Sequence, residues 1–147
     1  MQPDRVVVEV SSTVRRLRFS AGRTRELVEA TLTAEGIRDA MISVAFVGRT
    51  AITRINREHL RRAGPTDVIA FGMGRETPSM PAIGDIYICP EIAERNARQH
   101  GVSLREELAR LVVHGTLHVA GHDHPEDEAR TSSEMWQRQE RILATVG

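Results

Sequence analysis

Hydrophobic residues recur along the chain with two periods, one typical of strands and one typical of helices. Short runs rich in β-branched residues predict strands, because such side chains suit a pleated and partly buried surface. The four runs cover residues 6–10, 42–47, 68–71 and 85–89. Apolar residues spaced about one helical turn apart predict helices instead, as at Leu27, Val28 and Leu32. The five helical stretches cover residues 22–35, 50–59, 90–99, 104–120 and 131–144.

Residues with special backbone preferences mark the ends of these elements. Pro90 fits a first helical position, Ser103 and Glu106 form a capping-box pattern, and Gly121 fits the left-handed residue after a helix. Residues 72–82 have no periodicity and are expected to form a loop. The order of elements predicts an α+β fold, in which one compact domain (residues 1–147) packs a small mixed sheet of about four strands with about five helices.

Composition places the chain among ordinary soluble proteins, since 40% of its 147 residues are hydrophobic and 27% are charged. The single cysteine excludes an internal disulfide framework and a four-cysteine zinc site. No apolar run approaches the roughly 18 residues of a membrane-spanning helix, and the first residues lack the layout of a secretory signal. The expected location is the cytoplasm, with no membrane partner.

The charges balance overall but are distributed unevenly. All 20 basic residues are arginine; residues 1–75 hold 13 of them against 8 acidic residues, and residues 76–147 hold 7 against 12. An arginine-rich half suits phosphate contacts through bidentate hydrogen bonds, although codon usage alone could account for the missing lysine. The few aromatic residues argue against a sheet that stacks RNA bases.

Three histidines near the end of the fourth helix indicate a metal site. His114 and His118 are four residues apart, so both rings project from one helix face. Gly121 permits a sharp exit, after which His124 can return to a third position. Three nitrogen ligands with an open fourth place are typical of a catalytic zinc site, and Ni²⁺, Cu²⁺ and Fe²⁺ are alternatives. We assign His59 and His100 no metal role.

The spacing of these histidines is that of metzincin proteases, except that Gly115 occupies the position of their catalytic glutamate. Glycine cannot take a proton from water, which disfavours a peptidase of that kind. A metal ion combined with a clamp of arginines would suit phosphodiester cleavage instead.

Residues 114–124 closely resemble the histidine motif H-G-x-L-H-L-x-G-Y-D-H of the YbeY family of bacterial endoribonucleases, differing at Val119 and His122. Residues 65–71 resemble the family's P-T-D-V-L-S-F, and residues 84–86 its G-D-I. The resemblance covers roughly residues 40–145.

This resemblance implies an α+β fold with one Zn²⁺ per chain on His114, His118 and His124. It also implies cleavage of single-stranded RNA, with roles in 3′-end maturation of 16S rRNA and in ribosome quality control. The implied partners are rRNA and the small ribosomal subunit, together with a ribosomal protein or an assembly GTPase.

Members of the family carry an arginine shortly before P-T-D-V, whereas the ungapped position here is Leu60. Arg61 and Arg62 follow it, and with Arg57 they form a candidate phosphate clamp; a solvated helix end is the alternative. Ala70 and Gly72 replace the usual serine and proline. The group that transfers protons is unassigned.

Other residues receive structural interpretations. We expect Asp67 and Asp85 to cap local backbone, Cys89 and Trp136 to be buried, and Asp123 to orient a ligand ring or to serve in a turn. Two competing functions remain open: a ribosome-assembly factor whose metal is mainly structural, and a metal-dependent hydrolase of another substrate.

Overall fold

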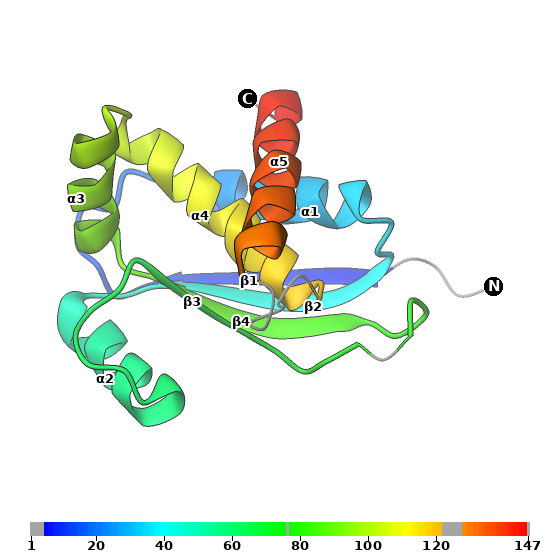
Figure 1. Ribbon diagram of the computed structural model, residues 1–147, viewed down its shortest axis with the longest axis horizontal. Coiled ribbons are helices and arrows are strands. Elements are labelled where there is room, and N and C mark those ends of the chain that lie inside the picture. Colours follow the sequence, from blue (N-terminus) through cyan, green and yellow to red (C-terminus); the bar gives the residue numbers. More distant parts are fainter. Residues whose placement is uncertain (1–4, 76, 122–127, 147) are drawn as a thin grey trace.

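Four strands form one mixed sheet in the computed structural model, which describes residues 5–75, 77–121 and 128–146, without side chains for 128–133 (Figure 1). The strands are β1 (Arg5–Ser12), β2 (Asp39–Phe46), β3 (Val68–Gly72) and β4 (Ala82–Ile88). Their order across the sheet is β1-β2-β4-β3. β2 pairs in parallel with both β1 and β4, and β3 pairs antiparallel with β4 at one edge.

Five helices accompany the sheet within the described ranges. They are α1 (Ala21–Ala34), α2 (Arg49–Leu60), α3 (Pro90–His100), α4 (Leu104–Val119) and α5 (Glu128–Val146). α1, α4 and α5 lie on one side of the sheet and α2 lies on the other, while α3 packs beside α4 (Figure 1). The predicted α+β class and the numbers of strands and helices are confirmed. No helix of the described chain is both long enough and apolar enough to cross a lipid bilayer.

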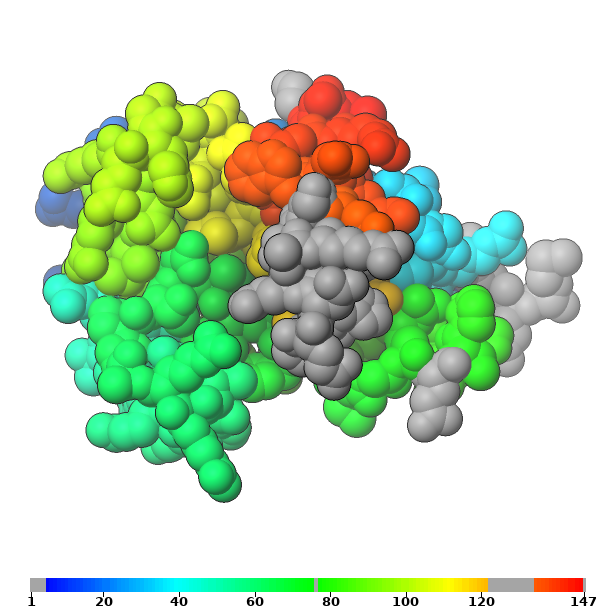
Figure 2. Space-filling view, in the orientation of Figure 1, coloured from blue at the N-terminus to red at the C-terminus, as the bar shows by residue number. Residues whose placement is uncertain are grey.

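α4 is the central helix of the core. Alternate residues of β2, among them Ile42 and Val44, point toward the helices and belong to the same buried apolar cluster as Leu108 and Val112 of α4. In the space-filling view, only a narrow strip of α4 is visible between α3 and α5 (Figure 2). A smaller apolar cluster lies under α2 on the opposite side of the sheet. The histidine-bearing helix is therefore fixed on several sides.

Two glycines bring α4 unusually close to the sheet. A Cβ atom on Gly115 would lie 2.7 Å from Cγ2 of Ile86 on β4, and one on Gly84 would lie 2.3 Å from the carbonyl oxygen of Phe71. Real Cβ atoms do not approach other heavy atoms this closely. Gly84 also accommodates Val119, whose Cγ2 would be 2.7 Å from the added atom. Larger side chains at either glycine would push α4 away from β4.

Most element boundaries agree with the sequence prediction to within two residues, but β2, β4 and α5 each begin three residues earlier than predicted. β4 begins at Ala82 rather than at residue 85, because Ala82 already pairs with Ala40 of β2 and Gly84 continues the strand. α5 begins at Glu128 and ends at Val146, longer at both ends than predicted.

The start of α4 has half of the predicted capping box. Ser103 Oγ accepts a hydrogen bond of 3.0 Å from the backbone N–H of Glu106. The Glu106 carboxylate lies 3.6 Å from the guanidinium of Arg110 instead of returning to Ser103. The prediction that Trp136 is buried is wrong: it is 54% exposed, and the guanidinium of Arg110 lies 5.6 Å from its ring centre. A cation packed on the ring face explains why an indole is tolerated at the surface.

Candidate metal centre

The two histidines on α4 lie where the sequence predicted them. His114 and His118 occupy the last turns of the helix, one turn apart on one face, and each is partly buried. The third predicted ligand, His124, lies outside the described residues, as do His122 and Asp123. Within the described ranges no three histidine, cysteine, aspartate or glutamate side chains come together as a metal site. The three-histidine site therefore remains a prediction.

His114 is held by a side chain from a different helix. Its Nδ1 lies 3.0 Å from Oε1 of Gln139 on α5. Gln139 is only 2% exposed, and its Nε2 donates a second hydrogen bond of 3.1 Å to Oε2 of Glu140. A buried amide is costly unless its polar atoms have partners. Gln139 meets this requirement by joining the His114 ring to a carboxylate.

Arg110 completes this chain of contacts one helical turn before His114. It donates two hydrogen bonds of 2.8 Å to the two oxygens of Glu140, the geometry that a guanidinium and a carboxylate favour. The bond to Arg110 lowers the pKa of Glu140, and the same bond raises the pKa of Arg110. Glu140 is therefore ionised at neutral pH and can only accept hydrogen bonds.

The direction of these hydrogen bonds fixes the state of the His114 ring. Because the Glu140 carboxylate only accepts, the group of Gln139 that faces it is the NH₂, and the amide oxygen faces His114. Nδ1 must then donate its proton to that oxygen, and in the neutral imidazole this leaves the lone pair on Nε2. An imidazole with a free Nε2 and an anchored Nδ1–H is the usual form of a metal ligand. The described residues thus fit a metal ion bound at Nε2 of His114.

Gly115 is a packing residue in this structure. Its α-carbon faces Ile86 of β4, and there is no room for a Cβ atom. In metzincin proteases the position that corresponds to Gly115 holds the general base. In this chain a side chain at that position would collide with Ile86 of the sheet. The absence of a glutamate at this position is therefore explained by the close contact between α4 and β4.

The three candidate clamp arginines lie at the end of α2. Arg57 is in its last turn, and Arg61 ends the helix in the left-handed region with φ 54°. Arg57, Arg61 and Arg62 are exposed, and their side chains make no hydrogen bond or ion pair with the described residues. Arg57 also borders a shallow hollow with Arg49 and Arg54. Figure 2 shows α2 as a prominent part of the surface.

β3 separates this arginine-bearing end of α2 from α4. The His59 ring contacts Phe71 of β3 edge-on, with 5.4 Å between ring centres, and Asn56 Nδ2 donates to the carbonyl of Gly64 in the preceding loop. On the other side of the strand, Gly72 lies against the backbone of Val119 at the end of α4. The arginines and the histidines are therefore attached to opposite sides of one edge strand. Whether the arginines contact a phosphate at the metal stays a prediction.

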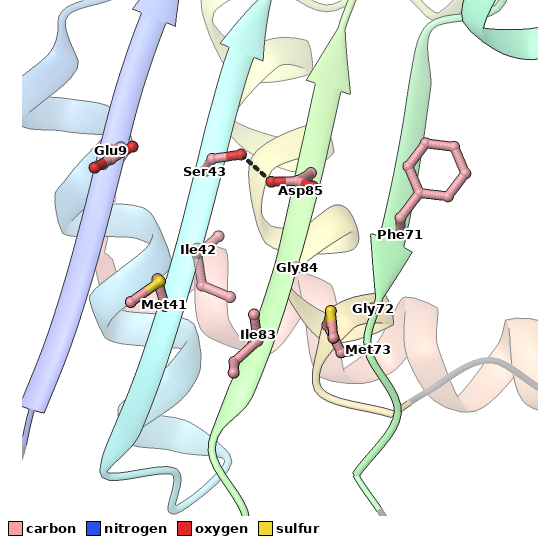
Figure 3. A pocket seen from close by; sticks show the side chains of 10 residues that line it. All are labelled: Glu9, Met41, Ile42, Ser43, Phe71, Gly72, Met73, Ile83, Gly84 and Asp85. Atoms are coloured by element: carbon pink, nitrogen blue, oxygen red, sulfur yellow. Dashed lines mark hydrogen bonds between the residues drawn. The ribbon is translucent and has the colours of Figure 1, made fainter. Parts of the chain in front are cut away.

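A second hollow lies on the open face of the sheet, beyond the area that α2 covers (Figure 3). Ser43 and Asp85 are its central polar pair, and Ser43 Oγ donates a hydrogen bond of 2.5 Å to Oδ1 of Asp85 across adjacent strands. The prediction that Asp85 caps local backbone is therefore wrong. Asp67 does cap, since its Oδ1 accepts from the N–H of Val68, and Cys89 is fully buried as expected. The hollow offers no nitrogen ligand for a metal.

Comparison with known proteins identifies the relationship that the histidine motif suggests. A family model described as Endoribonuclease YbeY matches residues 11–147. The chain belongs to the YbeY endoribonuclease family. An Endoribonuclease YbeY of Geobacter metallireducens is 34% identical over 95% of both chains, and one of Moorella thermoacetica is 40% identical over 82% of this chain and 83% of the relative. A Thermotoga maritima protein solved in solution superposes with a TM-score of 0.69 at 29% identity, over 95% of this chain and 89% of that one.

Sequence reasoning missed Gln139 and its partners Arg110 and Glu140. The sequence held a signal for Gln139, because the apolar residues Met135 and Ile142 lie four residues before it and three residues after it. Both are buried in the structure. These spacings place Gln139 on the apolar stripe of α5. An amide on such a stripe indicates a buried polar partner, but the sequence alone does not identify that partner as His114.

Proposed function

We propose that this YbeY family member is a zinc-dependent endoribonuclease that cleaves single-stranded RNA. The observation that supports it most is the His114 ring, which lies on the same face of α4 as His118 and is held with its Nε2 lone pair available. His114, His118 and His124 would hold one Zn²⁺. When bound, zinc supplies a Lewis acid that can activate water at neutral pH.

The chain's own residues have separate tasks in this proposal. The histidines hold the ion, and the exposed arginines Arg57, Arg61 and Arg62 contact the phosphates of the RNA strand. Guanidinium groups suit this task because they keep their charge at all physiological pH values and bind phosphate oxygens in pairs. The physiological substrate that we propose is the 3′ end of 16S rRNA, together with defective small subunits.

The test is a histidine substitution with a matched control. His118→Ala should abolish both the zinc content of the purified protein and cleavage of a single-stranded RNA oligonucleotide. His100→Ala removes an exposed histidine at the end of α3 and should change neither. Cleavage that persists in His118→Ala at the level of the unmodified chain would overturn the proposal and would point to a contaminating nuclease.

We further propose that the chain acts in the cytoplasm on the small ribosomal subunit, with a ribosomal protein or an assembly GTPase as partner. Sedimentation of cell extracts should place the protein with small subunits. The inactive His118→Ala variant should still sediment there if the arginines, rather than the metal, supply most of the affinity. A protein that stays at the top of the gradient under all growth conditions would contradict this part.

A further inference from the structure

We propose that Gln139, backed by Glu140 and Arg110, is a positioning residue that selects the Nδ1–H tautomer of His114 and so prepares its Nε2 for metal binding. The inference deepens the proposed function, on which its metal-binding part rests. It adds three residues outside the histidine motif to the site. None of them would touch the metal or the RNA.

The first step is the burial of the chain. The Gln139 side chain is almost fully enclosed between α4 and α5, and both of its polar groups are used, the oxygen by His114 and the nitrogen by Glu140. Among the described side chains no buried polar atom is left without a hydrogen-bond partner. Turning the amide over would set its NH₂ against Nδ1 and its oxygen against a carboxylate. Both hydrogen bonds would then require the other tautomer and a protonated Glu140.

The second step is the anchor at the far end. Arg110 carries only donors, and two of them bind Glu140 at 2.8 Å each. Glu140 is thereby held ionised, so it cannot donate to Gln139. Arg110 and His114 are four residues apart on α4, and Gln139 and Glu140 are adjacent on α5. The four side chains thus form a closed brace between two helices, and its hydrogen bonds run in one consistent direction.

The third step is the consequence for the metal. A neutral histidine in water populates both tautomers, and only the Nδ1–H form presents Nε2 to a metal ion. Fixing the tautomer and the ring orientation in the metal-free chain removes part of the ordering that binding would otherwise require. Loss of such an outer partner typically weakens metal affinity about 10- to 100-fold.

The test compares two substitutions at one position. Gln139→Met keeps the approximate volume and removes the acceptor. Gln139→Glu keeps an acceptor for Nδ1–H, and it keeps a donor toward Glu140 because two carboxyl groups in one site share a proton. Gln137→Met is the matched control, because it makes the same change at an exposed position of the same helix. Each variant is first compared with the unmodified chain by urea unfolding, to establish that it folds.

Two measurements separate this inference from the proposed function. In the metal-free chain at about pH 8, where imidazole is neutral, two-bond ¹H–¹⁵N NMR spectra report which ring nitrogen of His114 carries the proton. The signal is assigned by its loss in His114→Ala. We expect Nδ1–H in the unmodified chain, in Gln139→Glu and in Gln137→Met, and a mixture of tautomers in Gln139→Met.

The second measurement is Zn²⁺ affinity, by competition with a chelating dye. We expect a loss of about 10- to 100-fold in Gln139→Met, with Gln139→Glu and Gln137→Met close to the unmodified chain. An unchanged tautomer in Gln139→Met overturns the positioning role. An unmodified chain that binds no Zn²⁺ overturns the proposed function and the metal part of this inference, while the tautomer result still decides the role of Gln139.

Discussion

His114 and the arginines at the end of α2 are both candidates for chemistry, but the protein holds them in opposite ways. His114 is fixed by a buried hydrogen-bonded chain through Gln139, Glu140 and Arg110. The arginines Arg57, Arg61 and Arg62 extend into solvent without such support. The two groups lie on opposite sides of the edge strand β3. Their difference follows from what each task demands.

A metal ligand must meet the ion at a fixed distance and angle, so its orientation is best settled during folding. A phosphate contact tolerates reach and rearrangement, because the attraction acts over several ångströms and an RNA strand is itself flexible. Ordering a long arginine side chain costs up to about 2 kcal/mol of rotamer entropy, and leaving it free postpones that cost until RNA binds. Rigidity near the histidines and freedom near the arginines are therefore both consistent with the proposed nuclease.

The largest effect is expected where α4 meets the sheet. Gly84→Ala would set a Cβ atom 2.3 Å from the carbonyl oxygen of Phe71 and against Val119, so the end of the histidine-bearing helix must shift. We expect the free energy of unfolding to fall by about 3 kcal/mol, the upper part of the range for overpacking. Zn²⁺ affinity should fall with it. Urea unfolding and dye competition measure the two quantities.

Gly48→Ala is the matched control in the other region. Gly48 precedes α2, has φ −82°, and has nothing within 4 Å of an added Cβ atom. The loss of stability should stay below about 1 kcal/mol, the scale of a helix-cap change, with no change in Zn²⁺ affinity. If Gly84→Ala and Gly48→Ala lowered the free energy of unfolding equally, the close contact between Gly84 and the end of α4 would not be the cause of the loss.

An intermediate effect is expected from removing the arginines. The triple substitution of Arg57, Arg61 and Arg62 by alanine should weaken binding of single-stranded RNA and reduce the salt slope of log K by about 2, since each phosphate contact on a single strand contributes about 0.7. Zn²⁺ affinity should not change. Filter binding at several salt concentrations measures the slope.

A control must remove the same charge elsewhere. Arg95, Arg98 and Arg105 are exposed on α3 and at the start of α4, and their replacement by alanine alters net charge equally. If both triple variants reduce the salt slope of log K for RNA binding by the same amount, the affinity depends on total charge. Arg57, Arg61 and Arg62 then do not form a phosphate clamp.

The contrast between the regions also explains what could be read from the sequence. The helices and strands were predictable because burial imposes a period on each element, and α4 was predictable down to its serine cap and its histidine spacing. The burial of Trp136 was predicted wrongly, because an aromatic residue on a helix can pack one ring face against an arginine and still remain half exposed. Asp85 was misjudged because its partner Ser43 lies on a neighbouring strand, 42 residues away.

The part of the site that escaped prediction depends on contacts between distant helices. Gln139 meets His114 across 25 residues of sequence, and Arg110 meets Glu140 across 30. No local pattern encodes such pairs, since they arise only once α5 lies against α4. The reason for Gly115 was likewise hidden, because only the packed structure shows Ile86 beneath it.

The smallest expected effect concerns two carboxylates near Arg110 that respond to pH in opposite directions. Arg110 lowers the pKa of Glu140 in the folded chain, so the stability that Glu140 contributes is present above the ordinary glutamate pKa of about 4.3 and is lost as pH falls through the lowered value. Burial raises the pKa of Glu107, whose favourable contribution is instead present below the ordinary value and lost as pH rises through the raised one. Arg110 lies 3.9 Å from Glu107, too far to offset the burial.

Glu140→Gln should therefore lower the free energy of unfolding at pH 7, by about 1 kcal/mol or less after solvent screening, and the difference should vanish in acid. Glu107→Gln should raise it at pH 7, and that difference should also vanish in acid. Urea unfolding at neutral and acidic pH gives both signs in one experiment. If Glu140→Gln stabilises the chain at pH 7, the ionised carboxylate does not anchor the hydrogen-bonded chain. The direction of the hydrogen bonds to His114 would then have no cause, and His114 would no longer differ from the arginines in this way.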